Sequence, residues 1–411
     1  MATETKNTKA FYNTEIPIDW TIIQLGALGT FSKGKGILKE QVISEGLPCI
    51  RYGEIYTTHD FIIKEFKSFI SGDVAAESKE IKSGDILFAG SGETVEEIGK
   101  AVAYIGTAKA YAGGDVIILS TKSDVNPECL SYVLESDFVK RQKRVLGQGN
   151  SVVHIYSSDL SKVKIPLPPL SEQKAIARVL STADAAIHTT EKLITQKELR
   201  KKWLMQQLLT GKKRLKGFGG EWKKLGAGEI FKSVTKKGFA DEELLSATQD
   251  RGMIPRTMLE GRVTMPTTGT EGFKLVEIGD FVISLRSFQG GLEYSYYRGL
   301  VSPAYTVLKP KKKISEEFYK QYFKSYEFIG RLATAVIGIR DGKQISYDDF
   351  CIVNIPNPTI EEQTAIAQLL QAVDKEISLL KAKAEKLREQ KKGLMQVLLT
   401  GRVRLKIKKL I

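Results

Sequence analysis

The feature of this 411-residue sequence that most constrains its fold is a long segment that occurs twice. Residues 165–215 and 355–405 align without a gap, and 22 of the 51 aligned positions are identical. Both copies contain "EQ" shortly before "AIA" and end in the pattern "LMQxLLTGxxRL". Their spacing of 190 residues is far longer than the roughly 20–50 residues of a solenoid repeat. The sequence therefore predicts that whole domains were duplicated.

A weaker similarity precedes each copy of this repeat. Trp20 matches Trp222, and "SGDILFAG" from Ser83 corresponds to "IGDFVISL" from Ile278. Short β-rich runs and segments with helical periodicity predict a mixed α/β domain in each of these variable blocks. The predicted order is a first variable domain at residues 1–164 (of which 1–15 are flexible), a first helical region at 165–217, a second variable domain at 218–354 and a second helical region at 355–411.

Each repeat predicts one long helix. Residues 171–210 contain neither Pro nor Gly, and residues 361–400 contain only Gly393. Prolines precede both segments and a glycine follows "LLT" in both, as is usual at helix ends. Positions at alternating steps of four and three form a heptad seam that is mostly apolar. The seam comprises Ile176, Leu180, Ile187, Ile194, Leu204 and Leu208 in the first copy, and Ile366, Leu370, Ile377, Leu380, Leu387, Leu394 and Leu398 in the second.

This seam is a narrow apolar stripe between charged flanks, which suits another helix better than a globular core. We expect the two copies to pack together as an antiparallel, coiled-coil-like pair related by a pseudo-twofold axis. The predicted fold class is α+β, with two α/β-mixed domains separated by the two long helices. The alternative is two separate amphipathic helices, each lying on its own domain.

The charge balance points to a polyanionic partner. The sequence has 62 Lys plus Arg against 48 Asp plus Glu, a net charge of +14. Such an excess favours nucleic acid or an anionic membrane surface, although a merely solvated basic surface explains it equally well. The first 15 residues lack the apolar stretch of a signal peptide, and no apolar run is long enough to span a membrane. We therefore expect a cytoplasmic protein.

The sequence contains no convincing catalytic motif. Phosphate-loop, HExxH and GxSxG patterns are absent, and the three cysteines are too scattered for a disulfide framework or a zinc site. Asp73, Glu77 and Lys79 superficially resemble the acid–acid–lysine pattern of Mg²⁺ nucleases, but a solvated loop is the better interpretation. We predict that the chain has no catalytic residue, no metal site and no cofactor of its own.

Both variable blocks carry basic, aromatic and amide residues in segments interrupted by glycine. Arg and Lys pair with phosphates or guanine, and Asn and Gln match the adenine edge. Each residue alone is more often a solvated surface residue, but their presence in both blocks favours double-stranded DNA as the ligand. The candidate DNA-binding residues are Arg51, Tyr52, Ser91, Glu93, Thr94, Lys140, Arg141, Lys143, Arg144, Gln148 and Asn150 in the first block, and Arg286, Ser287, Gln289, Tyr294, Arg298, Arg340, Lys343 and Gln344 in the second.

The sequence resembles the DNA-specificity subunits of type I restriction–modification systems. The resemblance is carried by "IPLPPLSEQKAIA" at 165–177, "IPNPTIEEQTAIA" at 355–367 and the two "LMQxLLTGxxRL" endings. The domain starts, with Trp shortly before Leu-Gly, and the segments "SGDILFAGSGETVEEIGK" and "GLVSPAYTVL" also fit.

This resemblance implies a non-catalytic subunit whose variable blocks are target-recognition domains, each reading one half of a bipartite DNA site. It implies that the helical repeats dock two methyltransferase (modification) subunits and, through them, restriction subunits. AdoMet, ATP and Mg²⁺ would then belong to those partners. The resemblance does not assign base-contacting residues. Two alternatives remain: a coiled-coil scaffold without sequence-specific DNA binding, and a nuclease or methyltransferase that acts alone.

Overall fold

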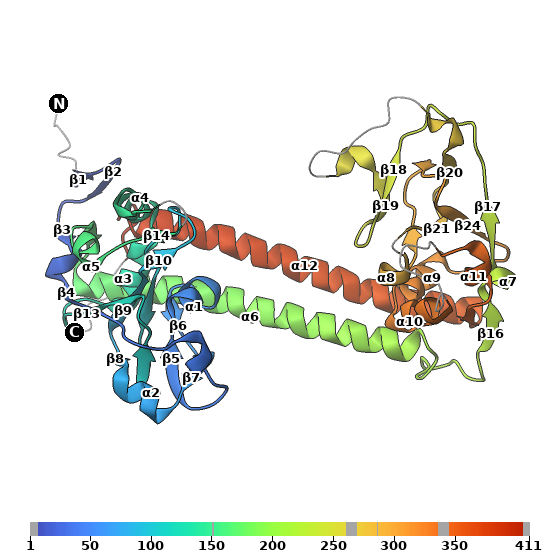
Figure 1. The fold of residues 1–411 in the computed structure, drawn as a ribbon. Helices are drawn as coiled ribbons and strands as arrows, with labels where there is room; N and C mark the ends of the chain where they lie inside the picture. The colour runs from blue at the N-terminus through green and yellow to red at the C-terminus, as the bar shows by residue number, and fades with distance from the viewer. Residues whose placement is uncertain (1–6, 150–151, 260–268, 286, 336–344, 406–411) are drawn as a thin grey trace, which may run out of the picture. The chain divides into compact units, whose positions relative to one another are not determined.

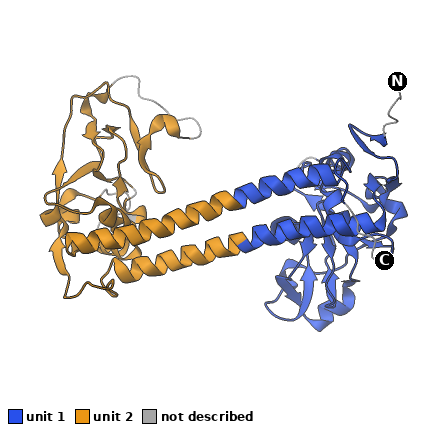
Figure 2. Ribbon diagram, turned by 180° about the vertical axis from the view of Figure 1, so that it is seen from behind, with its two compact units in different colours: residues 1–189, 384–411 blue, residues 190–383 orange. Residues whose placement is uncertain are grey.

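The computed structural model describes residues 7–149, 152–259, 269–285, 287–335 and 345–405. The chain forms two compact units (Figure 2). Unit 1 comprises residues 1–189 and 384–411, and unit 2 comprises residues 190–383. Each unit therefore combines one variable block with a stretch of both helical repeats. The four segments predicted from the sequence follow one another along the chain, whereas the two compact units group parts of them in space. The boundaries of the four segments stay a prediction.

The two repeats form the longest helices, α6 (Leu170–Leu208) and α12 (Ile360–Leu398), of 39 residues each (Figure 1). Their ends follow from the sequence. At the start of α6 the backbone N–H groups of Glu172 and Gln173 donate to the Pro169 carbonyl. Beyond the helix ends, Gly211 has φ 73° and Gly401 has φ 66°. This left-handed conformation is the usual way to terminate a helix, and glycine adopts it without a Cβ clash.

Within each unit the two helices pack against each other in opposite directions. In unit 2, Lys197 pairs with Glu376 at 2.6 Å and Lys201 pairs with Asp374 at 2.6 Å, so the partner number falls as the first number rises. In unit 1, Asp184 of α6 pairs with Lys391 of α12. The predicted fold class, two α/β-mixed domains with two long antiparallel helices, is confirmed.

The seam residues all face inward in the described helices. Ile176, Leu180, Ile366 and Leu370 are at most 1% exposed. The other seam residues are buried or half-buried, whereas most residues between them are exposed. The helices also close the cores of the variable domains, because Ile176, Leu180 and Leu398 belong to the largest hydrophobic cluster of unit 1.

The variable block of unit 1 contains a five-stranded sheet in the order β4-β13-β9-β11-β6 and a four-stranded sheet in the order β7-β5-β12-β8 (Figure 1). The strands of these sheets are β4 (Gly29–Lys33), β5 (Leu47–Ile50), β6 (Ile62–Ile63), β7 (Ser68–Ile70), β8 (Lys79–Ile81), β9 (Asp85–Ala89), β11 (Ala101–Tyr104), β12 (Ala110–Ala112) and β13 (Val116–Thr121). The remaining elements are β1 (Thr8–Phe11), β2 (Thr14–Pro17), β3 (Thr21–Gln24), β10 (Ser91–Gly92), β14 (Val153–His154), β15 (Lys164–Leu167), α1 (Tyr52–Thr57), α2 (Gly72–Glu77), α3 (Pro127–Leu134), α4 (Asp137–Leu146), α5 (Ser157–Leu160), η1 (Leu25–Ala27) and η2 (Lys39–Gln41).

Strand β9 is the central strand of the five-stranded sheet and is buried on both faces. Ile86 and Phe88 belong to the cluster that includes α3 and the long helices. Leu87 and Ala89 belong to a second cluster on the opposite face, which also includes Ile50. Side chains alternate between the two faces of a strand, so one continuous apolar run can serve two cores.

Unit 2 repeats this plan with a smaller sheet, in the order β17-β24-β21-β22. Its strands are β16 (Lys223–Gly226), β17 (Phe231–Val234), β18 (Leu245–Thr248), β19 (Gly252–Pro255), β20 (Lys274–Val276), β21 (Phe281–Ile283), β22 (Glu293–Tyr294), β23 (Gly299–Val301), β24 (Thr306–Pro310) and β25 (Asn354–Asn357). Its helices are α7 (Ala227–Ile230), α8 (Ser287–Gly290), α9 (Glu316–Phe323), α10 (Tyr326–Ala335), α11 (Tyr347–Cys351), η3 (Arg256–Met258) and η4 (Thr270–Gly272). Phe281 and Ile283 face the cluster that contains Ile366, and Val282 faces a separate cluster.

None of the helices in the described part of the chain is both long and apolar enough to cross a membrane.

Candidate nucleic-acid interface

Each variable domain is fastened to the helices by the same buried anchor. In unit 1 the Trp20 indole donates to the Glu172 carboxylate at 3.1 Å, and Arg404 donates two hydrogen bonds to the same carboxylate at 2.6 and 2.7 Å. In unit 2 the Trp222 indole donates to Glu362 at 2.9 Å. Both glutamates are at most 2% exposed. A buried charge requires such partners, because burial without them is costly.

In unit 2 the arginine of the anchor is Arg214, which donates two hydrogen bonds to the Glu362 carboxylate at 2.6 Å. Each anchor therefore joins the start of a variable block, the start of one repeat and the end of the other repeat. The glutamate of "EQ", the arginine of "GxxRL" and the tryptophan of the domain start were visible in the sequence only as repeated letters. Their shared contact explains why both copies keep them.

The candidate DNA-binding residues of the first block fall into different environments. Tyr52 is the first residue of α1 and is 40% exposed. Arg51 lies directly before it and is half-buried. Glu93 and Thr94 are exposed in the loop after β10. Ser91 is buried instead, and its hydroxyl is hydrogen-bonded to His154 Nδ1 at 3.0 Å.

The basic run of α4 contains one residue that the prediction misplaced. Lys143 is 2% exposed, and its ammonium donates to Glu135 at 3.0 Å and to the Gly99 carbonyl at 2.8 Å. Burial lowers the pKa of Lys143. Its role is a core ion pair, because α4 turns this side chain towards the domain interior. We therefore remove Lys143 from the candidate DNA-binding residues.

The other residues of this run lie at the surface. Lys140 and Arg144 are exposed and form ion pairs with Glu135 at 3.3 Å and with Glu96 at 2.5 Å. Arg141 and Gln148 are also exposed. Asn150 lies outside the described residues.

In the second block, burial again separates the candidates. Ser287 is 1% exposed, and its hydroxyl accepts a hydrogen bond from the Ser284 backbone. Tyr294 is 9% exposed and donates to Glu316 at 2.6 Å. Burial of the side chain, followed by this hydrogen bond, raises the pKa of Tyr294. These two residues belong to the core of the domain and are also removed from the candidates.

The remaining candidates of the second block are Gln289 and Arg298, both exposed. Arg286, Arg340, Lys343 and Gln344 lie outside the described residues.

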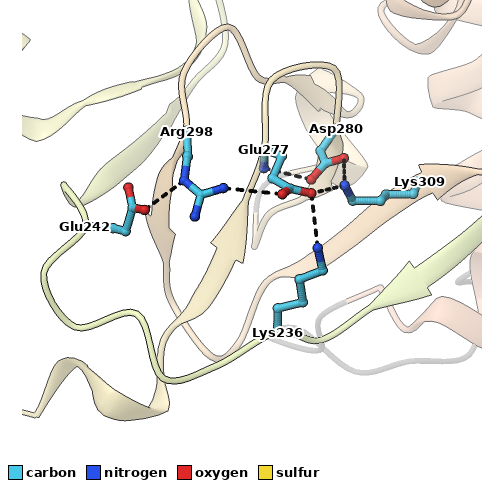
Figure 3. Close-up of polar contacts among 6 residues, drawn as sticks. All are labelled: Lys236, Glu242, Glu277, Asp280, Arg298 and Lys309. Atoms are coloured by element: carbon cyan, nitrogen blue, oxygen red, sulfur yellow. Dashed lines mark hydrogen bonds and ion pairs between the residues drawn. The ribbon is translucent and has the colours of Figure 1, made fainter.

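Arg298 is exposed but is held in an ion-pair network (Figure 3). Its guanidinium donates to Glu242 at 2.7 Å and to Glu277 at 3.3 Å. Glu277 also binds Lys309 and Lys236, and hydrogen bonding from Lys309 is the main reason that the pKa of Glu277 is lowered. The network adds Asp280 beside Lys309 at 3.3 Å, which gives three cations and three carboxylates. Its charges balance, so this face offers little net attraction for DNA.

Within the described ranges, no group of three or more His, Cys, Asp or Glu side chains is placed to hold a metal ion. Asp73 lies in the first turn of α2, whereas Lys79 begins β8. Cys49 and Cys129 are buried, and burial raises the pKa of each thiol to about 12. Neither thiol therefore has the lowered pKa that makes cysteine nucleophilic.

Two units, each with a mixed α/β domain anchored to a pair of long helices by the same Trp–Glu–Arg contact, define an internally duplicated protein. The chain belongs to the family described as "Type I restriction modification DNA specificity domain", whose model matches residues 17–198 and again residues 219–389. The prediction made from the repeated motifs is confirmed.

Two relatives from one organism match nearly the full chain. The putative type I restriction enzyme MjaX specificity subunit of Methanocaldococcus jannaschii is 28% identical, over 95% of this chain and 95% of the relative. The type I restriction enzyme MjaVIII specificity subunit of the same organism is 24% identical, over 98% and 97% of the two chains.

Solved structures share the fold. The type I restriction–modification S subunit from M. genitalium has a TM-score of 0.57 at 16% identity, and covers 97% of this chain and 99% of that one. A chain solved in a study of complex assembly and conformational transition of the type I R-M system has a TM-score of 0.58 at 18% identity, with 94% and 99% covered. At these identities the likeness supports the α/β-plus-helices fold and nothing finer.

Proposed function

We propose that this chain is the subunit of a type I restriction–modification complex that binds a bipartite double-stranded DNA sequence, each variable domain reading one half-site. The observation that carries the proposal is that the specificity-domain match occurs twice, over two units fastened by the same anchor. The net charge of +14 provides the attraction for DNA phosphates. The chain itself neither methylates nor cleaves DNA.

The partners in this proposal are two methyltransferase (modification) subunits, with restriction subunits bound through them. AdoMet, ATP and Mg²⁺ act in those partners, and this chain carries no cofactor. The complex works in the cytoplasm, where it meets the DNA.

The helical repeats contain a feature that supports docking of the same partner twice. When residues 171–210 are aligned with residues 361–400, sixteen positions are exposed in both copies. Fourteen of these positions carry different residues in the two copies. The two that are identical are Lys202 with Lys392, and Gln206 with Gln396. They lie four residues apart, on one face of the helix.

Packing does not account for these two identities. Most other identical positions of the repeat are buried or half-buried in both copies, and Arg214 and Arg404 form the anchors. Among the described residues, the side chains at 202, 206, 392 and 396 form no hydrogen bond or ion pair. A surface retained in two diverged copies without an internal contact is what two identical partners require, so we assign each Lys–Gln pair to one methyltransferase subunit.

Counting the bound subunits tests this assignment. We expect Lys202→Glu with Gln206→Ala to remove one of two methyltransferase subunits from the complex in native mass spectrometry. The matching change at 392 and 396 should remove the other, and the combined variant should bind none. Lys192→Glu and Lys383→Glu are matched controls, because both lysines are exposed on the same helices. Neither lysine is shared by the two copies, since Lys192 aligns with Ala382 and Lys383 aligns with Leu193. Two subunits retained by the combined variant would overturn the assignment.

DNA binding separates the proposal from its alternatives. The chain assembled with its methyltransferase subunit should bind duplex DNA with an affinity that falls steeply as salt rises. A scaffold without sequence-specific binding would bind its target duplex and unrelated duplexes with equal affinity at every salt concentration. Methyl transfer or cleavage by the rigorously purified chain alone would identify an enzyme instead.

A further inference from the structure

We propose that the turn after β4 in unit 1, residues Lys33 to Lys39, is a contact site for the sugar–phosphate backbone of double-stranded DNA. The inference rests on the proposed function. It adds to the DNA-binding surface lysines that the sequence patterns did not single out. This turn, the lysine turn below, has the sequence "KGKGILK".

The backbone of the lysine turn is strained. Gly36 has φ 67° and the next residue, Ile37, has φ 61°. Glycine adopts this left-handed conformation readily, but a β-branched residue rarely does. Strained backbone that persists in a folded protein is most often found at binding sites, where the surrounding structure enforces it.

Long-range contacts hold the lysine turn in this shape. The backbone N–H of Lys35 donates to the Ala112 carbonyl at 3.1 Å, and Gly114 donates to the Gly36 carbonyl at 3.1 Å. The Ile37 side chain is 5% exposed and packs in a cluster with Cys49 and Tyr111. The strain therefore fixes an apolar side chain inward while the lysines on either side point to solvent.

The lysines of the turn are available to a ligand. The Lys33 side chain is 70% exposed, and its nearest carboxylate is Asp115 at 3.9 Å. Lys35 and Lys39 are exposed, and in the described structure neither forms an ion pair. Glu40 follows in the short helix η2. The three lysines still outnumber the two neighbouring carboxylates, Asp115 and Glu40. The lysine turn therefore has the net positive charge that attracts a phosphate backbone.

Arg51 adds a further cation to the same place. It follows β5, whose last residue Ile50 is paired with Ala112 of β12. A Cβ on Gly113 would lie 3.5 Å from Arg51 Cγ and 3.6 Å from both the Gly36 carbonyl and Ile37 Cβ. Arg51 and the lysine turn therefore lie on either side of Gly113, which has no side chain to fill the space between them. Within the described structure Arg51 Nε is buried without a hydrogen-bond partner.

Unit 2 provides an internal comparison. A similar turn, "TKKG", follows β17, and Gly238 there has φ 88°. Its Lys236 is already paired with Glu277 at 3.3 Å in the balanced network of Figure 3. Among the described residues, the lysine turn of unit 1 forms only the 3.9 Å pair between Lys33 and Asp115, so we expect it to contact phosphates and Lys236 to contribute little.

The salt dependence of binding tests the site. The probe is a short duplex of random sequence, because phosphate contacts are independent of sequence. The logarithm of the binding constant falls with the logarithm of salt, with a slope of about 0.9 per phosphate contact. We expect Lys35→Ala to reduce this slope by about one in the assembled complex, and Lys35→Ala with Lys39→Ala to reduce it by about two. Lys35→Arg should keep the slope of the parent.

Two control variants complete the design. Lys122 is exposed at the opposite end of the same strand pair, where its ammonium donates to the Ala27 carbonyl at 2.8 Å. Lys122→Ala and Lys236→Ala should leave the slope unchanged. A parent complex that binds no duplex would overturn the proposed function and this site with it. Normal parent binding with the same slope in the Lys35 and Lys39 variants would overturn the phosphate site alone.

Discussion

Glu172 and Glu362 occupy the same position in the two repeats, and each is a buried carboxylate with one tryptophan and one arginine as partners. Such a group stabilises the fold only while all its partners are present, because a buried charge without a partner is costly. The anchor is therefore the point at which a single substitution should loosen a variable domain from the helices.

We expect Glu362→Gln to lower the free energy of unfolding by about 1.5–3 kcal/mol, the usual contribution of a hydrogen bond to a charged group. The amide still accepts the hydrogen bond from Trp222, but it leaves the Arg214 guanidinium without a counter-charge. Urea denaturation of the parent and variant measures the difference. Glu361→Gln is the matched control, because Glu361 is exposed next to it and should change stability by less than about 0.5 kcal/mol. Equal midpoints for the two variants would show that the anchor does not stabilise unit 2.

At the scale of elements, the glycines of α12 have two different roles. Gly393 lies inside the helix, and a Cβ built there meets nothing within 4 Å. Gly401 lies beyond the helix end with φ 66°, and a Cβ there would lie 2.4 Å from the Pro17 ring. The first glycine weakens the helix, whereas the second terminates it against the variable domain.

These roles predict opposite effects of the same substitution. Gly393→Ala should raise the free energy of unfolding by about 0.5–1 kcal/mol, because alanine is the better helix former. Gly401→Ala should lower it by at least about 1–2 kcal/mol, because the left-handed conformation is unfavourable for alanine and the clash with Pro17 is added. Thermal melts of the two variants test this pair. A stabilising Gly401→Ala would contradict the role of Gly401 as the helix terminator.

At the scale of the whole molecule, the duplication predicts modular reading of the DNA site. Replacing residues 218–354 with the matching block of another family member should change one half of the methylated sequence and leave the other half as before. The reason is that each variable block has its own sheet and its own hydrophobic clusters. Genome-wide mapping of methylated bases in cells with the chimaera and its methyltransferase subunit measures both halves. A change in both halves would contradict independent reading.

The duplication, the two long helices and their apolar seam all follow from the amino-acid sequence alone. These features are local, because helix ends depend on Pro and Gly at fixed positions and the seam depends on a spacing of three and four residues. The family follows from the sequence as well, because the repeat motifs are contiguous. The Trp–Glu–Arg anchor could be seen only as matching letters, since Trp20 and Arg404 are 384 positions apart and only folding joins them.

Which basic residues face solvent depends on the three-dimensional fold and could not be predicted from the sequence. Lys143 lies in the run "KRQKR", the most basic segment selected from the sequence, yet Glu135 and the Gly99 carbonyl hold it in the core. Lys35 lies in no segment that was selected from the sequence, yet strands β5, β12 and β13 shape the turn that exposes it. The physical reason is the same in both cases. Exposure of a charged side chain depends on partners contributed by distant segments, and a one-dimensional pattern does not contain those partners.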